Sequence, residues 1–111
     1  MAGVCSQFVL QNGQEAQVIV GPFLDSNGRP LTELVIEQAD VLISQNCSSF
    51  AMKTDANASD HMVNGFYLVK LAAADTLIVG PDRDNILTIS INISGALPVW
   101  KDVRIEPSSP A

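Results

Sequence analysis

Apolar and polar residues alternate along much of the chain, and the clearest alternation spans residues 86–94. Leu87, Ile89, Ile91 and Ile93 fall at every second position there, with threonine, serine or asparagine between them. Side chains of a β-strand alternate between its two faces, whereas a helix would spread these residues around its axis. The pattern therefore predicts a strand whose isoleucine-rich face belongs to the core.

Shorter runs of the same kind recur between turn signals. The last run, residues 98–106, places Val99, Val103 and Ile105 on one face and Trp100 on the other. Earlier β-prone runs cover residues 7–10, 16–20, 34–36, 39–44, 66–71 and 77–79. About seven short strands separated by turns predict an all-β fold, namely an antiparallel β-sandwich of the immunoglobulin-like type.

The length of 111 residues matches a single domain, and a hydrophobic fraction of 47% is ample for one packed core. We expect one domain over residues 1–106 and a flexible C-terminal tail at residues 107–111. The small polar residues 54–61 are expected to form a loop, because they show no periodic pattern. Residues 72–76 are expected to form a single helical turn.

Charge and hydropathy exclude several classes of partner. Twelve acidic and six basic residues give a net charge of −6, and no cluster of Lys or Arg reverses it locally, so nucleic-acid binding is not expected. No apolar run approaches the roughly 20 residues that span a bilayer, and no secretory signal is evident, so no membrane association is expected. Charged residues make up only 16% of the chain, which indicates that a partner covers part of its surface.

The cysteines and the histidine do not form a recognisable site. Cys5 and Cys47 are expected to be free thiols in a reducing cytosol, and a disulfide between them is the less favoured alternative. They lack Cys-x-x-Cys spacing, and a single histidine, His61, cannot complete a zinc site. We interpret His61 beside Asp60 as an exposed loop residue rather than as part of a catalytic triad.

An acidic turn offers the one alternative metal site. Asp82, Asp84 and Asn85 could supply oxygen ligands to Ca²⁺, but their spacing is not that of a calcium-binding helix–loop–helix, and the metal-free interpretation is preferred. Neither a glycine-rich phosphate loop nor a Gly-x-Ser-x-Gly elbow is present. We therefore expect no enzyme activity, no cofactor and no metal.

Three residues are candidates for a protein interface: Trp100, Phe66 and Leu68. Trp100 either turns into the core at a bulge after the preceding proline or anchors a subunit interface, where tryptophan is enriched. Phe66 and Leu68 alternate with Tyr67, so both faces of this strand are apolar and another chain can cover one of them. Tyr67 itself is expected to bond its hydroxyl to backbone near the corner at residues 75–76.

Two segments resemble a known family. Residues 65–71 (Gly-Phe-Tyr-Leu-Val-Lys-Leu) with the following Asp75 and Thr76, and residues 96–100 (Ala-Leu-Pro-Val-Trp), resemble an immunoglobulin-like module of tailed-bacteriophage virion proteins. Further matching positions are the turn at residues 25–28 and the run at residues 39–44. The resemblance extends over roughly residues 16–106, and the Ala-Leu-Pro-Val-Trp segment is its most specific part.

The resemblance implies a virion structural protein that is assembled in the host cytoplasm and decorates or stabilises the capsid by protein–protein binding. Its implied partners are the major capsid protein or tail proteins, together with further copies of itself in a homo-oligomer. Alternatives are a tail, baseplate or head–tail joining subunit, or a module that recognises a glycan or receptor on the host surface, because sandwiches serve both kinds of role.

Overall fold

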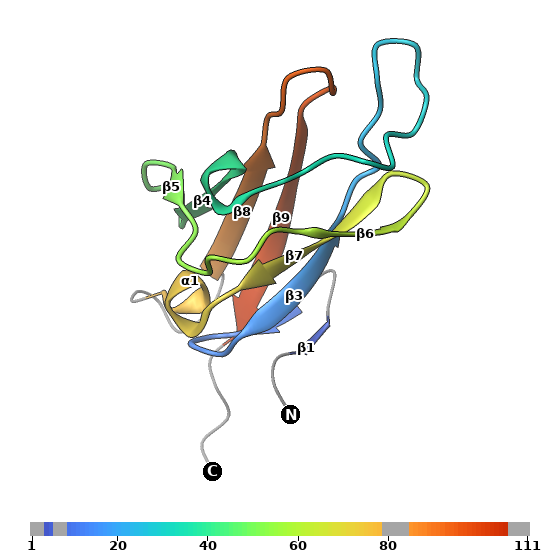
Figure 1. Cartoon of the computed structure of the whole chain (residues 1–111). Coiled ribbons are helices and arrows are strands. Elements are labelled where there is room, and N and C mark those ends of the chain that lie inside the picture. Colours follow the sequence, from blue (N-terminus) through green and yellow to red (C-terminus); the bar gives the residue numbers. More distant parts are fainter. Residues whose placement is uncertain (1–3, 6–8, 79–84, 107–111) are drawn as a thin grey trace.

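Two β-sheets face each other in the computed structural model, which describes residues 4–5, 9–78 and 85–106 (Figure 1). The first sheet has the strand order β1 (Val4–Cys5), β3 (Ala16–Val20), β7 (Phe66–Leu71) and β6 (Asp60–Val63). The second has the order β2 (Val9–Gln11), β9 (Val99–Glu106), β8 (Asn85–Ile91), β4 (Val41–Gln45) and β5 (Ala51–Met52).

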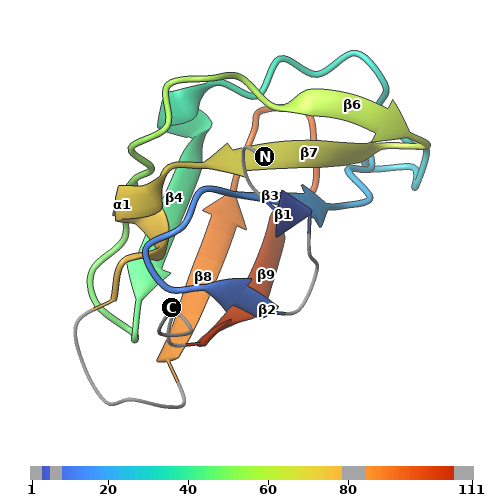
Figure 2. The same cartoon turned by 90° about the horizontal axis from the view of Figure 1, so that it is seen from below.

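Most neighbouring strands run antiparallel, and the exceptions are β1 beside β3 and β2 beside β9, which are parallel pairs. The helical elements of the described residues are short: a 3₁₀ turn, η1 (Gln38–Asp40), and one α-helical turn, α1 (Ala73–Thr76). Seen from below, the two sheets form separate layers (Figure 2). The expected all-β sandwich and the single helical turn are confirmed.

Both sheets turn their apolar residues into one shared core. On β8, Leu87, Ile89 and Ile91 are almost fully buried, as the alternation predicts. Other core members are Val18, Val20, Phe23, Ile36, Val41, Ile43, Tyr67, Val69, Leu71, Val103 and Ile105. Burial of a large apolar side chain contributes about 1.5–3 kcal/mol, so this cluster is the main stabilising term of the fold.

The strand expected over residues 86–94 is shorter in the structure and does not include Ile93. β8 ends at Ile91, and Ile93 is only partly buried, packed against the edge of the core. The chain turns here because the carbonyl oxygen of Ile93 accepts a hydrogen bond from the Ala96 amide at 3.1 Å, and Gly95 between them has a φ of 89°. A turn of this kind ends the strand before the apolar alternation ends.

The segment before β4 also differs from expectation. Residues 34–36 are not a strand, although Ile36 is fully buried, and β4 begins at Val41 rather than at residue 39. The side chain of Asp40 accepts a hydrogen bond from the Glu37 amide at 3.0 Å, which closes the 3₁₀ turn. Ala39 is exposed on that turn, so it does not join the core with Val41.

Two further expected elements differ from the structure, and two expectations concern residues that it does not describe. Residues 77–78 are not a strand, and β6 begins inside the expected loop, at Asp60. The tail at residues 107–111 and the acidic residues Asp82 and Asp84 lie outside the described residues.

Candidate interaction surface

Trp100 lies on β9 with 68% of its surface exposed. Val103 and Ile105 are buried on the opposite face of the strand, as period two predicts. The pairing of β9 with β8 continues without a shift from Val99 to Ile105, and Trp100 pairs directly with Ser90. The structure thus decides against the core position that the sequence left open for Trp100.

Trp100 stands at one end of a row of side chains across the outer face of the second sheet. The strand register places Ser90 beside Trp100, Leu42 of β4 beside Ser90, and Met52 of β5 beside Leu42. Leu42 and Met52 are 38% and 51% exposed. Because paired residues of antiparallel strands point to the same face, Trp100, Ser90, Leu42 and Met52 share one surface, which we call the apolar row.

Leu42 and Met52 are members of this surface that sequence reasoning missed. Leu42 was readable, because it occupies the outward position between the buried Val41 and Ile43. Met52 carried no such signal, since β5 has only two residues and shows no period. Only the pairing of β5 with β4 brings this methionine to the row.

Polar side chains border the apolar row along β8 and β9. The hydroxyl of Thr88 donates a hydrogen bond to Oδ1 of Asp102 at 2.6 Å, one step along the strands from Trp100. Beyond this pair, Nη2 of Arg104 lies 3.8 Å from Oε1 of Glu106. The row thus contains three apolar side chains, with Ser90 between Trp100 and Leu42, and polar residues at its border. Apolar and aromatic residues inside a polar rim are typical of protein interfaces.

Phe66 and Leu68 lie on a different surface. They point outward from β7 in the first sheet and are partly buried, with Ile19 of β3 paired beside Leu68. An ion pair of 2.9 Å between Lys70 and Asp60 lies on the same face. Because β7 and β9 belong to different sheets, the structure does not bring Phe66 and Leu68 together with the apolar row.

Lys101 occupies an inward position that the sequence analysis left without a role. It follows Trp100 on β9, and its Nζ donates a hydrogen bond to the carbonyl oxygen of Ile19 at 3.0 Å. This contact links the second sheet to the first. Burial lowers the pKa of Lys101, because the charged ammonium group is partly removed from water.

The prediction that the Tyr67 hydroxyl bonds to backbone near residues 75–76 is wrong. The hydroxyl donates a hydrogen bond to the carbonyl oxygen of Leu31 at 2.7 Å and accepts one from the amide of Leu34 at 3.0 Å. The corner at residues 75–76 lies beyond the other end of β7, and a strand advances about 3.3 Å per residue, so the hydroxyl cannot reach it. Tyr67 instead secures the segment that leads toward η1.

His61 is exposed as expected, but it lies on strand β6 rather than in a loop. Its Nε2 accepts a hydrogen bond from the Gly65 amide at 3.2 Å, and its ring lies edge-on to Tyr67 with 5.1 Å between centroids. Asp60 forms its ion pair with Lys70. The neighbouring carboxylate therefore does not orient the imidazole as a triad requires.

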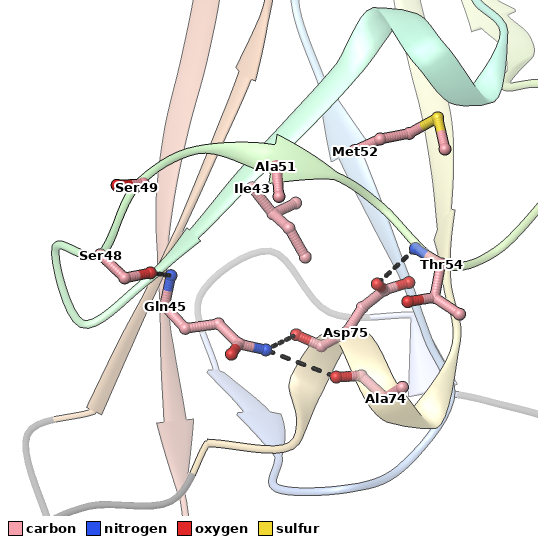
Figure 3. A pocket seen from close by; sticks show the side chains of 9 residues that line it. All are labelled: Ile43, Gln45, Ser48, Ser49, Ala51, Met52, Thr54, Ala74 and Asp75. Atoms are coloured by element: carbon pink, nitrogen blue, oxygen red, sulfur yellow. Dashed lines mark hydrogen bonds between the residues drawn. The ribbon is translucent and has the colours of Figure 1, made fainter.

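A hollow of about 240 Å³ lies between β4, β5 and α1 (Figure 3). Asp75 borders it and is 1% exposed, and its carboxylate accepts hydrogen bonds from the amides of Thr54 (2.6 Å), Asp55 (3.2 Å) and Ala72 (2.8 Å). Nε2 of Gln45 donates to the carbonyl oxygen of Asp75 at 3.0 Å. Since backbone amides bind both carboxylate oxygens, Asp75 joins α1 to the segment after β5.

Lys53 is the second buried charged residue, with 1% of its surface exposed. Its Nζ donates to the carbonyl oxygens of Asp55 and Asn57 at 2.7 and 3.0 Å and lies 3.3 Å from Oδ1 of Asp55. Burial by itself raises the pKa of Asp55, but hydrogen bonds from the Asn57 amide and Lys53, with the charge of Lys53, lower it below its usual value. This arrangement folds the loop over Lys53.

Possible metal ligands and the cysteines are the remaining candidates for a chemical site. No group of three or more His, Cys, Asp or Glu is placed there to hold a metal ion. Asn85, the described member of the acidic turn, accepts a hydrogen bond from Nδ2 of Asn46 at 2.9 Å. Cys47 is an exposed free thiol, whereas the side chain of Cys5 is outside the described set.

Within the described ranges, no helix has the length and apolar character needed to cross a membrane. A scan against protein-family models, a search of curated proteins and a search of solved structures each found no match to the chain. Its function is therefore inferred from its own surface and from the resemblance of its two segments.

Proposed function

We propose that the protein is a structural subunit of a tailed-phage virion that decorates the capsid and binds the major capsid protein through the apolar row. The exposure of Trp100 in line with Leu42 and Met52 carries the proposal. Scattered exposed apolar residues need no explanation, but aligned ones form a patch of the kind that partners cover. Tryptophan and methionine are also enriched in protein interfaces.

The strand order supports the immunoglobulin-like part of the proposal. In an immunoglobulin domain, strands A, B, E and D form one sheet, and strands C, F and G form the other. If β3, β4, β6, β7, β8 and β9 are taken as B, C, D, E, F and G, the first sheet has the order B–E–D and the second G–F–C. The resembling segment at residues 65–71 then covers the whole of strand E, and the segment at residues 96–100 leads into the first two residues of strand G.

The acidic charge of the protein indicates which charges its partner surface carries. The chain has a net charge of −6, and Asp102 borders the apolar row next to Trp100. Complementary charge steers association and suppresses wrong partners. The capsid surface that covers the row should therefore offer an apolar pocket for the indole, with Lys or Arg at its rim.

The test is to count the chain in purified phage particles by quantitative mass spectrometry, for wild type, Trp100→Glu and Val35→Glu. Val35 is a matched control, because it is also 68% exposed but lies in neither sheet. A tryptophan hot spot contributes about 2 kcal/mol or more, which corresponds to roughly 30-fold weaker binding. We expect hundreds of wild-type copies per particle, unchanged Val35→Glu occupancy, and severe loss of Trp100→Glu.

Other outcomes would contradict parts of the proposal in distinct ways. A copy number of about a dozen or fewer would indicate a tail, baseplate or head–tail joining subunit instead of capsid decoration. Binding of the purified protein to host cells or glycans, with none in particles, would indicate a recognition module. Complete absence from particles and cells would remove the virion assignment, and equal occupancy of the two variants would remove the apolar row as the interface.

A further inference from the structure

The chain contains three Asn–Gly pairs, at residues 12–13, 27–28 and 64–65, and each glycine has a positive φ, of 73°, 80° and 86°. At such a pair the glycine amide nitrogen can attack the side-chain carbonyl carbon of the asparagine, because glycine has no Cβ to hinder the approach. The attack also requires that the amide lose its proton. The three sites should therefore differ according to what accepts that hydrogen.

The acceptors differ in one decisive respect. The Gly13 amide donates to the carbonyl oxygen of Thr76 at 3.3 Å, and the Gly28 amide donates to the carbonyl oxygen of Asp25 at 3.0 Å. The Gly65 amide donates to Nε2 of His61 at 3.2 Å. A peptide carbonyl is not a base near neutral pH, whereas a neutral imidazole is the side chain most often used as one.

The fold holds His61 in this position. A register shift between His61 and Val63 lies next to the two-residue turn, and His61 itself pairs with Tyr67 across the hairpin. The imidazole lies edge-on to the ring of Tyr67, which is fully buried and bonded through its hydroxyl to the segment after β3. With Nε2 as the acceptor, the ring proton of this neutral tautomer is on Nδ1.

The asparagine side is open to reaction as well. Asn64 is exposed at the turn, and among the described residues no hydrogen bond restrains its amide. By contrast, Nδ2 of Asn12 donates to the carbonyl oxygen of Ile78 at 2.9 Å, which holds that amide in place. Asn27 is also exposed in a tight turn, and the amide of its glycine donates to a carbonyl oxygen, so it is the comparison site without a base, although Asn64 has a φ of 49° and Asn27 has no positive φ.

We propose that the Asn64–Gly65 pair is a self-modification site at which His61 is the general base for deamidation. Nε2 of His61 takes the proton of the Gly65 amide as its nitrogen bonds to Cγ of Asn64. The imidazolium then returns the proton to Nδ2, the Cγ–Nδ2 bond breaks, and ammonia leaves a succinimide. Water opens the ring to aspartate or isoaspartate, so one amide and one water become one carboxylate and one ammonium ion.

The product would change this corner of the fold. Isoaspartate adds a carbon to the backbone between residues 64 and 65, where the Phe23 amide donates to the carbonyl oxygen of Gly65 at 2.8 Å. The site is also crowded, since a Cβ on Gly65 would lie 2.8 Å from the carbonyl oxygen of Phe23. Modification at Asn64 therefore adds one negative charge and disturbs the junction between the hairpin and the segment after β3.

The experiment follows all three Asn–Gly sites in one purified, full-length sample by peptide mapping during incubation at neutral pH. General acid–base catalysis contributes about 10²–10⁴-fold, so we expect Asn64 to react at least about tenfold faster than Asn27. The variant His61→Gln retains a hydrogen-bond acceptor without a base. In this variant Asn64 should deamidate at close to the rate of Asn27, and the rates at Asn12 and Asn27 should not change. Added free imidazole should raise the deamidation rate at Asn64 again.

A second measurement needs no variant, which protects the test if His61→Gln folds poorly. Folding normally slows deamidation, but assistance by a folded-state base should make Asn64 react faster in buffer than in concentrated urea, while Asn12 reacts more slowly in buffer. Equal rates at Asn64 and Asn27 in the native protein would overturn the proposal. So would a folded His61→Gln variant whose Asn64 reacts as fast as in wild type, or a wild-type Asn64 that reacts faster in urea.

Discussion

Buried residues with polar side chains are held mainly by hydrogen bonds to backbone atoms, some of them nearby in the sequence and some in other segments. Asp75 binds three amides, Lys53 binds two carbonyl oxygens, and the Tyr67 hydroxyl binds one carbonyl and one amide. A buried polar group without such partners would cost several kcal/mol. These residues therefore hold the irregular segments around the sheets, where few apolar contacts are available.

The carboxylate of Asp55 is predicted to contribute a pH-dependent part of the folding stability. Its pKa is lowered in the folded chain, so its carboxylate contributes stability that is fully present above the unfolded-state pKa of about 3.9 and is lost as the pH falls through the lower folded-state value. At pH 7, Asp55→Asn should cost about 1.5–3 kcal/mol, because the buried Lys53 loses its counter-charge. The measurement is the free energy of unfolding in urea as a function of pH.

The difference between wild type and Asp55→Asn should remain constant from pH 7 to about pH 5 and shrink below about pH 4. Asp25→Asn is a suitable control, since Asp25 is also in a loop and also accepts backbone hydrogen bonds but has no buried lysine beside it. A difference that does not vary with pH would show that Asp55 acts only through its shape.

Among the elements, the hairpin of β6 and β7 shows how turn chemistry and packing combine. Asn64 and Gly65 have φ values of 49° and 86°, the positive angles that a two-residue hairpin turn requires and that Asn–Gly adopts readily. Gly65 is also packed against the backbone of Phe23. Gly28, by contrast, has a similar φ of 80° with open space where a Cβ would lie.

Substituting these two glycines separates the loss of stability caused by an unfavourable φ from the loss caused by a steric clash. Gly28→Ala should destabilise the protein by about 1–2 kcal/mol, the cost of a Cβ in the left-handed region. Gly65→Ala should cost about 1–3 kcal/mol more, because its Cβ would also displace the Phe23 carbonyl. Equal losses in chemical denaturation would show that the junction with Phe23 is soft and that only the backbone angle matters.

The whole molecule presents two different outer surfaces on either side of one core. The second sheet carries the apolar row, and the first carries Phe66 and Leu68 beside the Lys70–Asp60 ion pair. The candidate interface predicted from sequence is thus divided between two faces. Under the proposed function, one neighbour covers the row and the other face is left for a second contact or for solvent.

Two isoleucines of β8 test the sandwich itself. Ile91 is 1% exposed toward the core, and Ile86 is 44% exposed on the outer face, opposite Arg104. Ile91→Asp should destabilise the fold severely, because an unpaired buried charge costs about 3–5 kcal/mol, a large share of a typical stability of about 5–15. Ile86→Asp should remain folded with a change below about 1 kcal/mol.

Far-ultraviolet circular dichroism and chemical denaturation distinguish the two variants, with a β-type spectrum expected for wild type and Ile86→Asp. A folded Ile91→Asp protein of near wild-type stability would contradict the position of this residue in a shared core. A dominant helical spectrum of the wild type would contradict the sandwich as a whole.

The sequence by itself determined the strands with clear period-two patterns, such as residues 16–20 and 66–71, and the tight turns, whereas the outward position of Trp100 was decided by the unshifted pairing of β9 with β8. Alternation is a local property of a strand, so it can be read wherever a strand is long enough to show it. The Asn–Gly turn is local in the same way, since it depends on the backbone preferences of two residues.

Only the tertiary structure decided which of these local features meet. Met52 reached the apolar row because β5 pairs with β4, and Tyr67 found Leu31 and Leu34 because the chain returns past the start of β7. Both contacts join different segments of the chain, and alternation within one strand says nothing about which segments lie beside it. Strand order and register therefore place Leu42 and Met52 on the same surface as Trp100 and put Phe66 and Leu68 on the other sheet.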